Sequence, residues 1–242
     1  MKALLSSTYF GPIQWYQKLN RYDECLIERH ESFIKQTYRN RMLIPTTNGP
    51  LSLTIPTNHN TSLAMKDIRI SDHANWRHVH WNALLSAYGE SPFFEYYQDD
   101  IRPFYEKKYE FLFDFNMEIT EKMIELLDIR PKISITSEYI QNEEPKAQCI
   151  ESEESEELRA QSEEFSSIAN HKVQSSNLKV QSKEVQSMVD FREAIRPKKP
   201  LPDAEFESKR YYQVYEQKFG FQPNMSILDL LFNEGNEAIF YL

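Results

Sequence analysis

The sequence predicts a single α/β domain with a mixed sheet, helices packed on it and a disordered acidic insertion. Short stretches with the two-residue period of strands come first, and stretches with the helical period follow. A repetitive, polar segment separates two information-rich blocks. We therefore predict that residues 1–140 and 188–242 form one domain, interrupted by 141–187, because 242 residues less this segment suffice for one ordinary domain.

The N-terminal block is expected to begin with a strand, a turn, a helix and a second strand. Residues 3–9 alternate small, apolar and hydroxyl side chains, and residues 24–28 form another short strand. Gly11 and Pro12 mark a turn between them. After the turn, large side chains recur at the helical spacing, at Ile13, Tyr16 and Leu19.

Two further strands are expected to form a hairpin. Residues 37–45 and 51–56 have strand character, and the segment 46–50 between them contains Asn48-Gly49. Because Asn and Gly readily adopt a positive φ, this is the firmest hairpin signal in the chain. One more strand is predicted at 67–70.

From Asp72 onwards the hydrophobic period becomes helical. Asp72 is available as the N-cap, and the broad stripe that follows consists of Trp76, Val79, His80, Ala83, Leu84, Ala87 and Tyr88. We expect helices over residues 74–128, packed against the sheet.

Two more helical segments and a strand follow. Ser91 and Pro92 open a short aromatic turn of helix. Pro103 lies in the first turn of a long helix that ends before Pro131. Residues 132–136 are predicted to be a strand.

Residues 141–187 differ in kind from the rest of the chain. Glutamate and serine dominate 143–164, and a four-residue unit ending in Val-Gln-Ser recurs at 172–175, 179–182 and 184–187. So polar a segment buries too little apolar surface to offset its conformational entropy, which predicts a disordered or loosely helical insertion. The alternative is a docking loop for a protein partner.

The C-terminal block is expected to complete the domain. Residues 211–215 begin a strand or a helix. Ser226 is the predicted N-cap of a helix that Gly235 ends, and Asp229 stands where a capping box needs an acceptor. A final apolar strand is expected over 237–242.

Composition excludes several classes of function. The net charge of -9 disfavours nucleic acid as the main partner, because such proteins usually need a basic face. No apolar run approaches the roughly 20 residues that span a bilayer, so no membrane span is expected. Cys25 lies in a predicted strand and Cys149 in the insertion, so we expect no structural disulfide and a cytoplasmic location.

The strongest chemical cluster is basic and local. If residues 37–45 form a strand, Arg39 and Arg41 project from one face with Asn40 between them. Two guanidinium groups in that position can fork onto a phosphate or carboxylate, which predicts an anionic small-molecule ligand. The alternative is that both arginines lie on a solvated strand face, paired with acidic side chains.

The turn after the first strand is a second candidate. Ligands of α/β proteins lie outside the carboxyl ends of strands, and a helix N-terminus offers free amides to an anion. Tyr9 and Gln14 flank Gly11 at this turn and can orient a ligand. The alternative is a plain turn, since the chain has no glycine-rich phosphate loop.

Histidines form the third candidate. His73 is the predicted general base, because imidazole titrates near neutrality. His73 and His80 are seven residues apart, which is not the spacing of a helical zinc site, so no metal is predicted. No particular cofactor is indicated. The alternative is that His80 is a hydrogen-bonded core residue and that His73 and His78 lie on the surface.

Six motif stretches carry a family resemblance. They are Tyr-Phe-Gly-Pro-Ile-Gln-Trp-Tyr at 9–16, Gln-Thr-Tyr-Arg-Asn-Arg at 36–41, Asn-Gly-Pro-Leu-Ser-Leu at 48–53, Asp72-His73 with Trp76, Ser-Pro-Phe-Phe-Glu-Tyr-Tyr at 91–97 and Pro-Asn-Met-Ser-Ile-Leu-Asp at 223–229. Through them the chain resembles the WbqC-like protein family, in its short Bacteroidetes form. This family takes its name from surface-polysaccharide (O-antigen) gene clusters.

The resemblance implies a cytoplasmic, transferase-like enzyme that acts on an activated, nucleotide-linked sugar in polysaccharide biosynthesis. The resemblance assigns no residue roles; from charge, turn position and imidazole chemistry we expect Arg39 and Arg41 to bind the anion, Tyr9 and Gln14 to orient the sugar or acceptor, and His73 to be the general base. The alternative is a non-catalytic binding or scaffold protein of the polysaccharide machinery, with 141–187 as its docking element.

Overall fold

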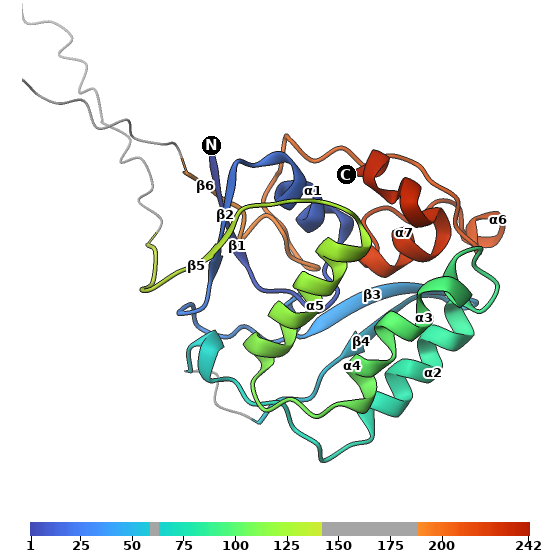
Figure 1. Ribbon diagram of the computed structural model, residues 1–242, viewed down its shortest axis with the longest axis horizontal. Coiled ribbons are helices and arrows are strands. Elements are labelled where there is room, and N and C mark those ends of the chain that lie inside the picture. The colour runs from blue at the N-terminus through green and yellow to red at the C-terminus, as the bar shows by residue number, and fades with distance from the viewer. Residues whose placement is uncertain (59–62, 142–187) are drawn as a thin grey trace, which may run out of the picture. The chain divides into compact units, whose positions relative to one another are not determined.

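The computed structural model describes residues 1–58, 63–141 and 188–242, and it shows an α/β domain with a parallel sheet. The predicted insertion lies outside these residues, apart from residue 141. The four strands are β1 (Lys2–Ser6), β2 (Glu24–Glu28), β5 (Ile133–Ile135) and β6 (Met188–Asp190). They pair in parallel in the order β5-β2-β1-β6 (Figure 1). The predicted fold class is confirmed.

The predicted strands are divided between two sheets. β3 (Arg41–Thr46) and β4 (Gly49–Thr54) form a separate antiparallel hairpin. Gly49 has a φ of 97° at its turn, as the Asn-Gly signal predicts. The parallel and antiparallel pairings therefore do not share one sheet.

The first part of the strand predicted over 37–45 is wrong. Residues 37–40 form a bend and a turn, which hydrogen bonds connect to other segments of the chain. The Asn116 side-chain amide donates to the Arg39 carbonyl at 2.8 Å, and the Asn40 side-chain amide donates to the Ile55 carbonyl at 3.0 Å. The strand begins only at Arg41.

Helices surround these sheets. They are α1 (Ile13–Arg21), α2 (Trp76–Tyr88), α3 (Phe94–Ile101), α4 (Pro103–Glu106), α5 (Leu112–Leu126), α6 (Glu216–Phe219) and α7 (Ile227–Glu234), with short 3-10 helices η1 (Met65–Asp67) and η2 (Gly235–Tyr241). In Figure 1 the β3–β4 hairpin lies between the parallel sheet and the α2–α4 helices.

The single long helix predicted from Pro103 is wrong, because the chain leaves the helix between α4 and α5. There Ile70 donates to the Glu110 carbonyl at 2.9 Å, and Leu112 donates to the Ile68 carbonyl at 2.8 Å. The strand predicted at 67–70 is reduced to these bonds and two isolated bridges. Each of the two extended segments satisfies the other's backbone groups.

α2 departs from its prediction in two ways. Asp72 does not cap the helix, which follows Asn75, and instead forms ion pairs with Arg77 and Lys108. Val79 is 59% exposed, so it lies outside the buried stripe. Buried as predicted are Trp76, His80, Leu84, Ala87 and Tyr88.

The C-terminal helix begins at the predicted residue. The Ser226 hydroxyl accepts from the Leu228 amide at 3.3 Å and donates to the Phe10 carbonyl at 2.8 Å. The capping box is incomplete, because the Ser226 amide donates to Leu43 rather than to Asp229. The strand predicted over 237–242 is wrong, because the residues up to Tyr241 lie in η2. The buried residues Gly235, Ala238 and Leu242 are spaced by three and four.

Ser226→Ala should lower the free energy of unfolding by about 1–2 kcal/mol, since it removes the cap and leaves the buried Phe10 carbonyl without its donor. Urea denaturation measures the change. Ser86→Ala on α2, where the side chain is exposed, is the control and should change little. Equal effects in the two variants would contradict the capping role.

Two negative observations concern the described part of the chain. Over residues 1–58, 63–141 and 188–242, no helix is both long and apolar enough to cross a membrane. Cys25 is buried and free. Cys149 lies outside the described residues.

Candidate functional site

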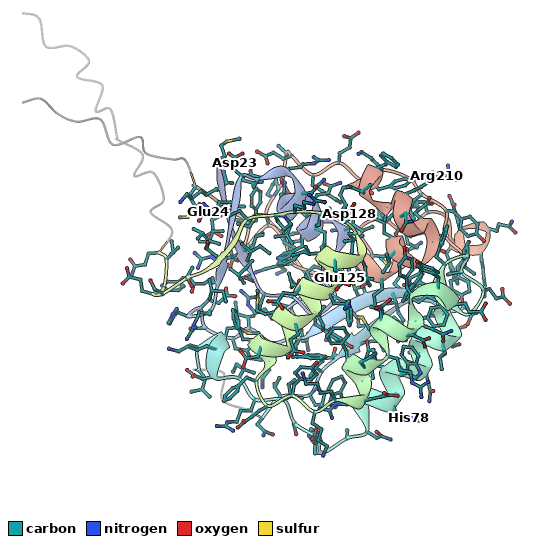
Figure 2. All side chains as sticks on the ribbon, in the orientation of Figure 1. Asp23, Glu24, His78, Glu125, Asp128 and Arg210 are labelled. Carbon is teal, nitrogen blue, oxygen red and sulfur yellow. The ribbon has the colours of Figure 1, made fainter. Side chains whose placement is uncertain are left out.

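The carboxyl ends of the parallel strands meet at one edge of the sheet, where ligands of open α/β sheets usually bind. Ser6 ends β1, Glu28 ends β2, Thr136 follows β5 and Asp190 ends β6. In Figure 2, Asp23 and Glu24 mark the opposite edge, at the amino end of β2. The segments at the carboxyl edge are rich in buried charged and hydroxyl groups.

Arg39 and Glu31 form the central ion pair of this edge. Arg39 Nε donates to Glu31 Oε1 at 2.7 Å, and its Nη2 donates both to Glu31 Oε2 and, at 2.8 Å, to the Ser6 hydroxyl. Arg39 Nη1 donates to the Thr37 hydroxyl at 3.2 Å. The arginine and the glutamate are both buried. The guanidinium is therefore committed to protein acceptors.

A second group of buried charges surrounds Glu28. This carboxylate accepts from the Thr136 hydroxyl at 2.8 Å and from the Ile140 amide at 2.9 Å. Arg192 Nη1 lies 3.8 Å from it, and Arg192 also binds Asp190 through Nε and Nη2. The edge thus joins β2, β5 and β6 by charge-assisted bonds.

His30 has an unfilled hydrogen-bonding position at this edge, as does the neighbouring Arg29. It follows β2, it is half-buried, and its backbone amide donates to Glu28 Oε1 at 2.7 Å. Its Nε2 is buried without a hydrogen-bond partner among the described residues. This nitrogen can still accept or donate one hydrogen bond.

A small cavity of about 10 Å³ opens at the same edge and has room for about one water molecule. It is lined by Leu5, Ser6, Thr8, Trp15, Tyr38, Arg39, Phe191, Arg192 and Ile195. The Thr8 hydroxyl is buried and has no partner in the described part of the chain. The cavity therefore joins an unsatisfied hydroxyl to both buried arginines.

The predicted arginine pair is not arranged as expected. Arg39 lies in the turn at the carboxyl edge, whereas half-buried Arg41 begins β3 and donates from Nε to the Thr54 hydroxyl at 3.0 Å. Since residues 37–40 are not extended, these two side chains do not share a strand face. The Asn40 side-chain oxygen is buried and has no described partner.

Tyr9 lies in the core rather than in an open pocket. Its hydroxyl oxygen is 2.9 Å from His80 Nδ1 and 2.9 Å from the Tyr105 hydroxyl. Burial, reinforced by Tyr105, raises the pKa of Tyr9 well above its usual value. Burial lowers the pKa of His80 to about 4, against the effect of a hydrogen bond with the Thr54 backbone. This network holds neutral side chains at pH 7.

The amides at the start of α1 are occupied by the chain itself. Ile13 donates to the Met225 carbonyl at 3.1 Å, and Gln14 donates to Asn224 Oδ1 at 3.0 Å. The Gln14 side chain donates to Asp203 at 2.8 Å and accepts from Asn224. The Tyr9–Gln14 turn is therefore the junction onto which residues 223–229 dock.

His73 lies in an exposed segment before α2. Its Nδ1 is hydrogen bonded to the Ser71 hydroxyl, two residues earlier. Within the described ranges, no hydrogen bond joins His73 to Tyr9, Gln14 or Arg39. The structure thus brings only Arg39, of the predicted site residues, to the carboxyl edge of the sheet.

Sequence reasoning missed Glu28, His30, Glu31 and Arg192. A signal for the first three was present, because Glu28-Arg29-His30-Glu31 comes directly after the predicted strand 24–28. The rule that ligands lie at carboxyl ends of strands was applied to the first strand alone. Arg192 carried no such signal, since β6 follows the polar segment and was not predicted.

Among the described residues there is no group of three or more His, Cys, Asp or Glu side chains able to hold an ion. The side chains at the carboxyl edge are buried ion pairs, hydroxyl groups and the His30 imidazole.

Comparison with known proteins settles the family. A model of the WbqC-like protein family matches residues 7–197 and 200–241. The chain belongs to this family. The WbqC-like match covers the turn at Tyr9, the residues of the carboxyl edge other than Ser6, and the C-terminal helix.

A relative from Mycobacterium tuberculosis, "Uncharacterized protein Rv1507c", is 25% identical over 243 residues. The alignment covers 99% of this WbqC-like chain and 96% of the relative. No solved structure matches the chain.

Proposed function

We propose that this WbqC-like protein is a transferase-like enzyme that acts on an activated, nucleotide-linked sugar in surface-polysaccharide (O-antigen) biosynthesis. The observation that supports it is the carboxyl edge of the parallel sheet, where an open imidazole stands among buried carboxylates, arginines and hydroxyls. The same proposal includes two further points, the short Bacteroidetes form and a cytoplasmic location. Both follow from the resemblance carried by the motif stretches.

His30 takes the role of general base in this proposal, in place of His73. Its Nε2 needs a partner, and the adjacent Glu28 and Glu31 are held in place by several hydrogen bonds each. A transferred group needs an acceptor from which a proton is removed, and histidine is the side chain that most often serves as a general base. Arg39 and Arg192 fix the carboxylates, and Thr8 offers an open hydroxyl.

His30→Asn should lower turnover by about 100-fold with little change in melting temperature, because it removes the base from a half-buried position. The substrate is found first, by a thermal-shift screen of nucleotide sugars and nucleoside diphosphates. Product formation is then followed by mass spectrometry.

His73→Asn is the matched control, since it makes the same change at the residue predicted from sequence. It should leave turnover within a factor of two or so. The reverse result, with His73→Asn inactive and His30→Asn active, would return the role to His73. A screen in which no nucleotide-linked sugar raises the melting temperature would contradict the proposed substrate class.

A further inference from the structure

A second hollow lies on the surface between α2 and α4, away from the residues of the carboxyl edge. Its volume is about 370 Å³, which falls in the range of small-ligand sites. The lining residues are Asn75, Arg77, His78, Trp81, Arg102, Tyr105, Glu106 and Lys108. His78 projects from this region at the lower edge of Figure 2. We name this hollow the α2–α4 cleft.

Three cationic side chains line the α2–α4 cleft. Arg102 and Lys108 are 58% and 80% exposed, and each pairs with one carboxylate, Glu106 and Asp72 respectively. Exposed pairs of this kind contribute little to stability, so both cations can turn to a ligand at small cost. The rim is therefore adaptable and basic.

Arg77 is the least satisfied of the three. Its Nη1 donates to Asp72, and its guanidinium lies 4.6 Å from the centroid of the Trp76 ring. Its Nε and Nη2 are buried and have no hydrogen-bond partner among the described residues. A guanidinium with unfilled donors in a cleft wall is suited to phosphate, which supplies several acceptor oxygens.

Aromatic side chains form the other part of the cleft. Trp81 is half-buried and packs against Tyr105, with ring centroids 5.8 Å apart, and against Phe94 at 6.3 Å. The exposed part of Trp81 belongs to the cleft wall. A rigid indole next to cations is a surface on which a planar ring can stack while its phosphate is bound.

The start of α2 adds to the same preference. Asn75 lines the cleft and precedes the helix without a side-chain capping bond, so the first-turn amides lack a cap. These amides and the helix dipole favour an anion near Arg77 and His78.

From these contacts we infer that the α2–α4 cleft binds a nucleoside phosphate, with the phosphate held by Arg77, Arg102 and Lys108 and the base stacked on Trp81. The inference does not depend on the proposed transfer reaction, because it uses none of the residues at the carboxyl edge of the sheet. None of the six site residues predicted from sequence lines this cleft, so the inference adds a separate ligand site.

The test is a titration of the full chain with UDP and with ADP, in which isothermal calorimetry and tryptophan fluorescence measure binding. Arg102→Gln and Lys108→Gln should each weaken binding about tenfold, because each removes a charged donor to phosphate. Both residues are exposed, so the variants should keep the melting temperature of the parent. Trp81→Phe should remove most of the fluorescence change.

Lys107→Gln is the matched control, since it removes the same charge from the neighbouring residue. Lys107 is 59% exposed, pairs with Glu118 and does not line the cleft. It should leave the affinity unchanged. Ribose 5-phosphate is the probe for a sugar phosphate, and binding as tight as that of UDP would overturn the stacked base.

Two other results would overturn the inference. One is the absence of saturable binding by either nucleotide at millimolar concentration. The other is an equal loss of affinity in Lys107→Gln and Lys108→Gln, which would show attraction by general charge alone. Neither result bears on turnover in His30→Asn, so the two proposals fail separately.

Discussion

Arg39→Met is expected to lower the free energy of unfolding by about 3–5 kcal/mol, because it removes one partner of a buried ion pair. The side chains of Arg39 and Glu31 are only 3% and 7% exposed. Without the guanidinium, the Glu31 carboxylate stays buried with the Ser6 hydroxyl, at 3.1 Å, as its remaining donor. Urea denaturation at pH 7 measures the loss.

Two controls separate the ion pair from the loss of side-chain volume. Arg41→Met makes the same substitution at a half-buried residue that bonds Thr54, and we expect a loss within about 1 kcal/mol. The double variant Glu31→Gln with Arg39→Met removes both charges and should recover much of the stability. A loss in Arg39→Met no larger than in Arg41→Met would contradict a structural role for the pair.

The structural role of Arg39 affects how its predicted role in ligand binding can be tested. Replacing Arg39 removes hydrogen bonds that connect β1 with the 31–39 segment. Weaker ligand binding in such a variant therefore reflects both altered folding and the loss of a contact with the ligand. The sequence predicts a basic cluster at Arg39 and Arg41 that binds an anion, and in the structure Arg39 forms a buried ion pair with Glu31. The alternative interpretation, pairing with acidic side chains, is correct for Arg39, but the pair is buried and does not lie on a solvated strand face.

The local signals predicted most of the secondary structure, and long-range pairing decided the rest. The turn at Asn48-Gly49 and the cap at Ser226 depend on neighbouring residues, and both are present. The break between α4 and α5 depends on residues 68–70, about 40 positions earlier, whose backbone pairs with Glu110 and Leu112. The helical periodicity around residue 110 reflects neighbouring residues only, so it cannot predict pairing with residues 68–70.

The same distinction explains the candidate site. The ends of the predicted strands are visible in the sequence, but their order in the sheet is not. β5 and β6 lie at opposite edges, and only this order brings Thr136 and Asp190 to the segments after β2 and β1. A single sequence therefore predicts which strands exist, but it does not predict which strand ends lie next to each other in the sheet.

The pH dependence of stability is expected to contain two large and opposed contributions, from His80 and Asp229. His80 is buried, and burial lowers its pKa from 6.5 to about 4. Between these values the unfolded chain binds more protons at this residue, so stability rises with pH by about 3 kcal/mol from pH 4 to 6.5. This contribution is lost as the pH falls through that range.

Asp229 has the opposite sign. Its carboxyl is fully buried, and burial raises its pKa from 3.8 to about 6, although the Tyr211 hydroxyl and the Gln213 amide bind the charged form. Between these values the folded chain binds more protons, so stability falls by about 3 kcal/mol as the pH rises from 3.8 to 6. The two contributions therefore nearly cancel over the range they share.

Single variants expose each contribution, and their difference from the parent removes the background of other acidic groups. For Asp229→Asn, which keeps an acceptor oxygen, the stability relative to the parent should increase by about 3 kcal/mol between pH 4 and 6. For His80→Gln it should decrease by a similar amount between pH 4 and 6.5. Urea denaturation across this range measures both. Difference curves that are flat would mean that neither buried group changes its pKa on folding, whereas slopes of the expected opposite signs would show that Asp229 and His80 offset each other in the native protein.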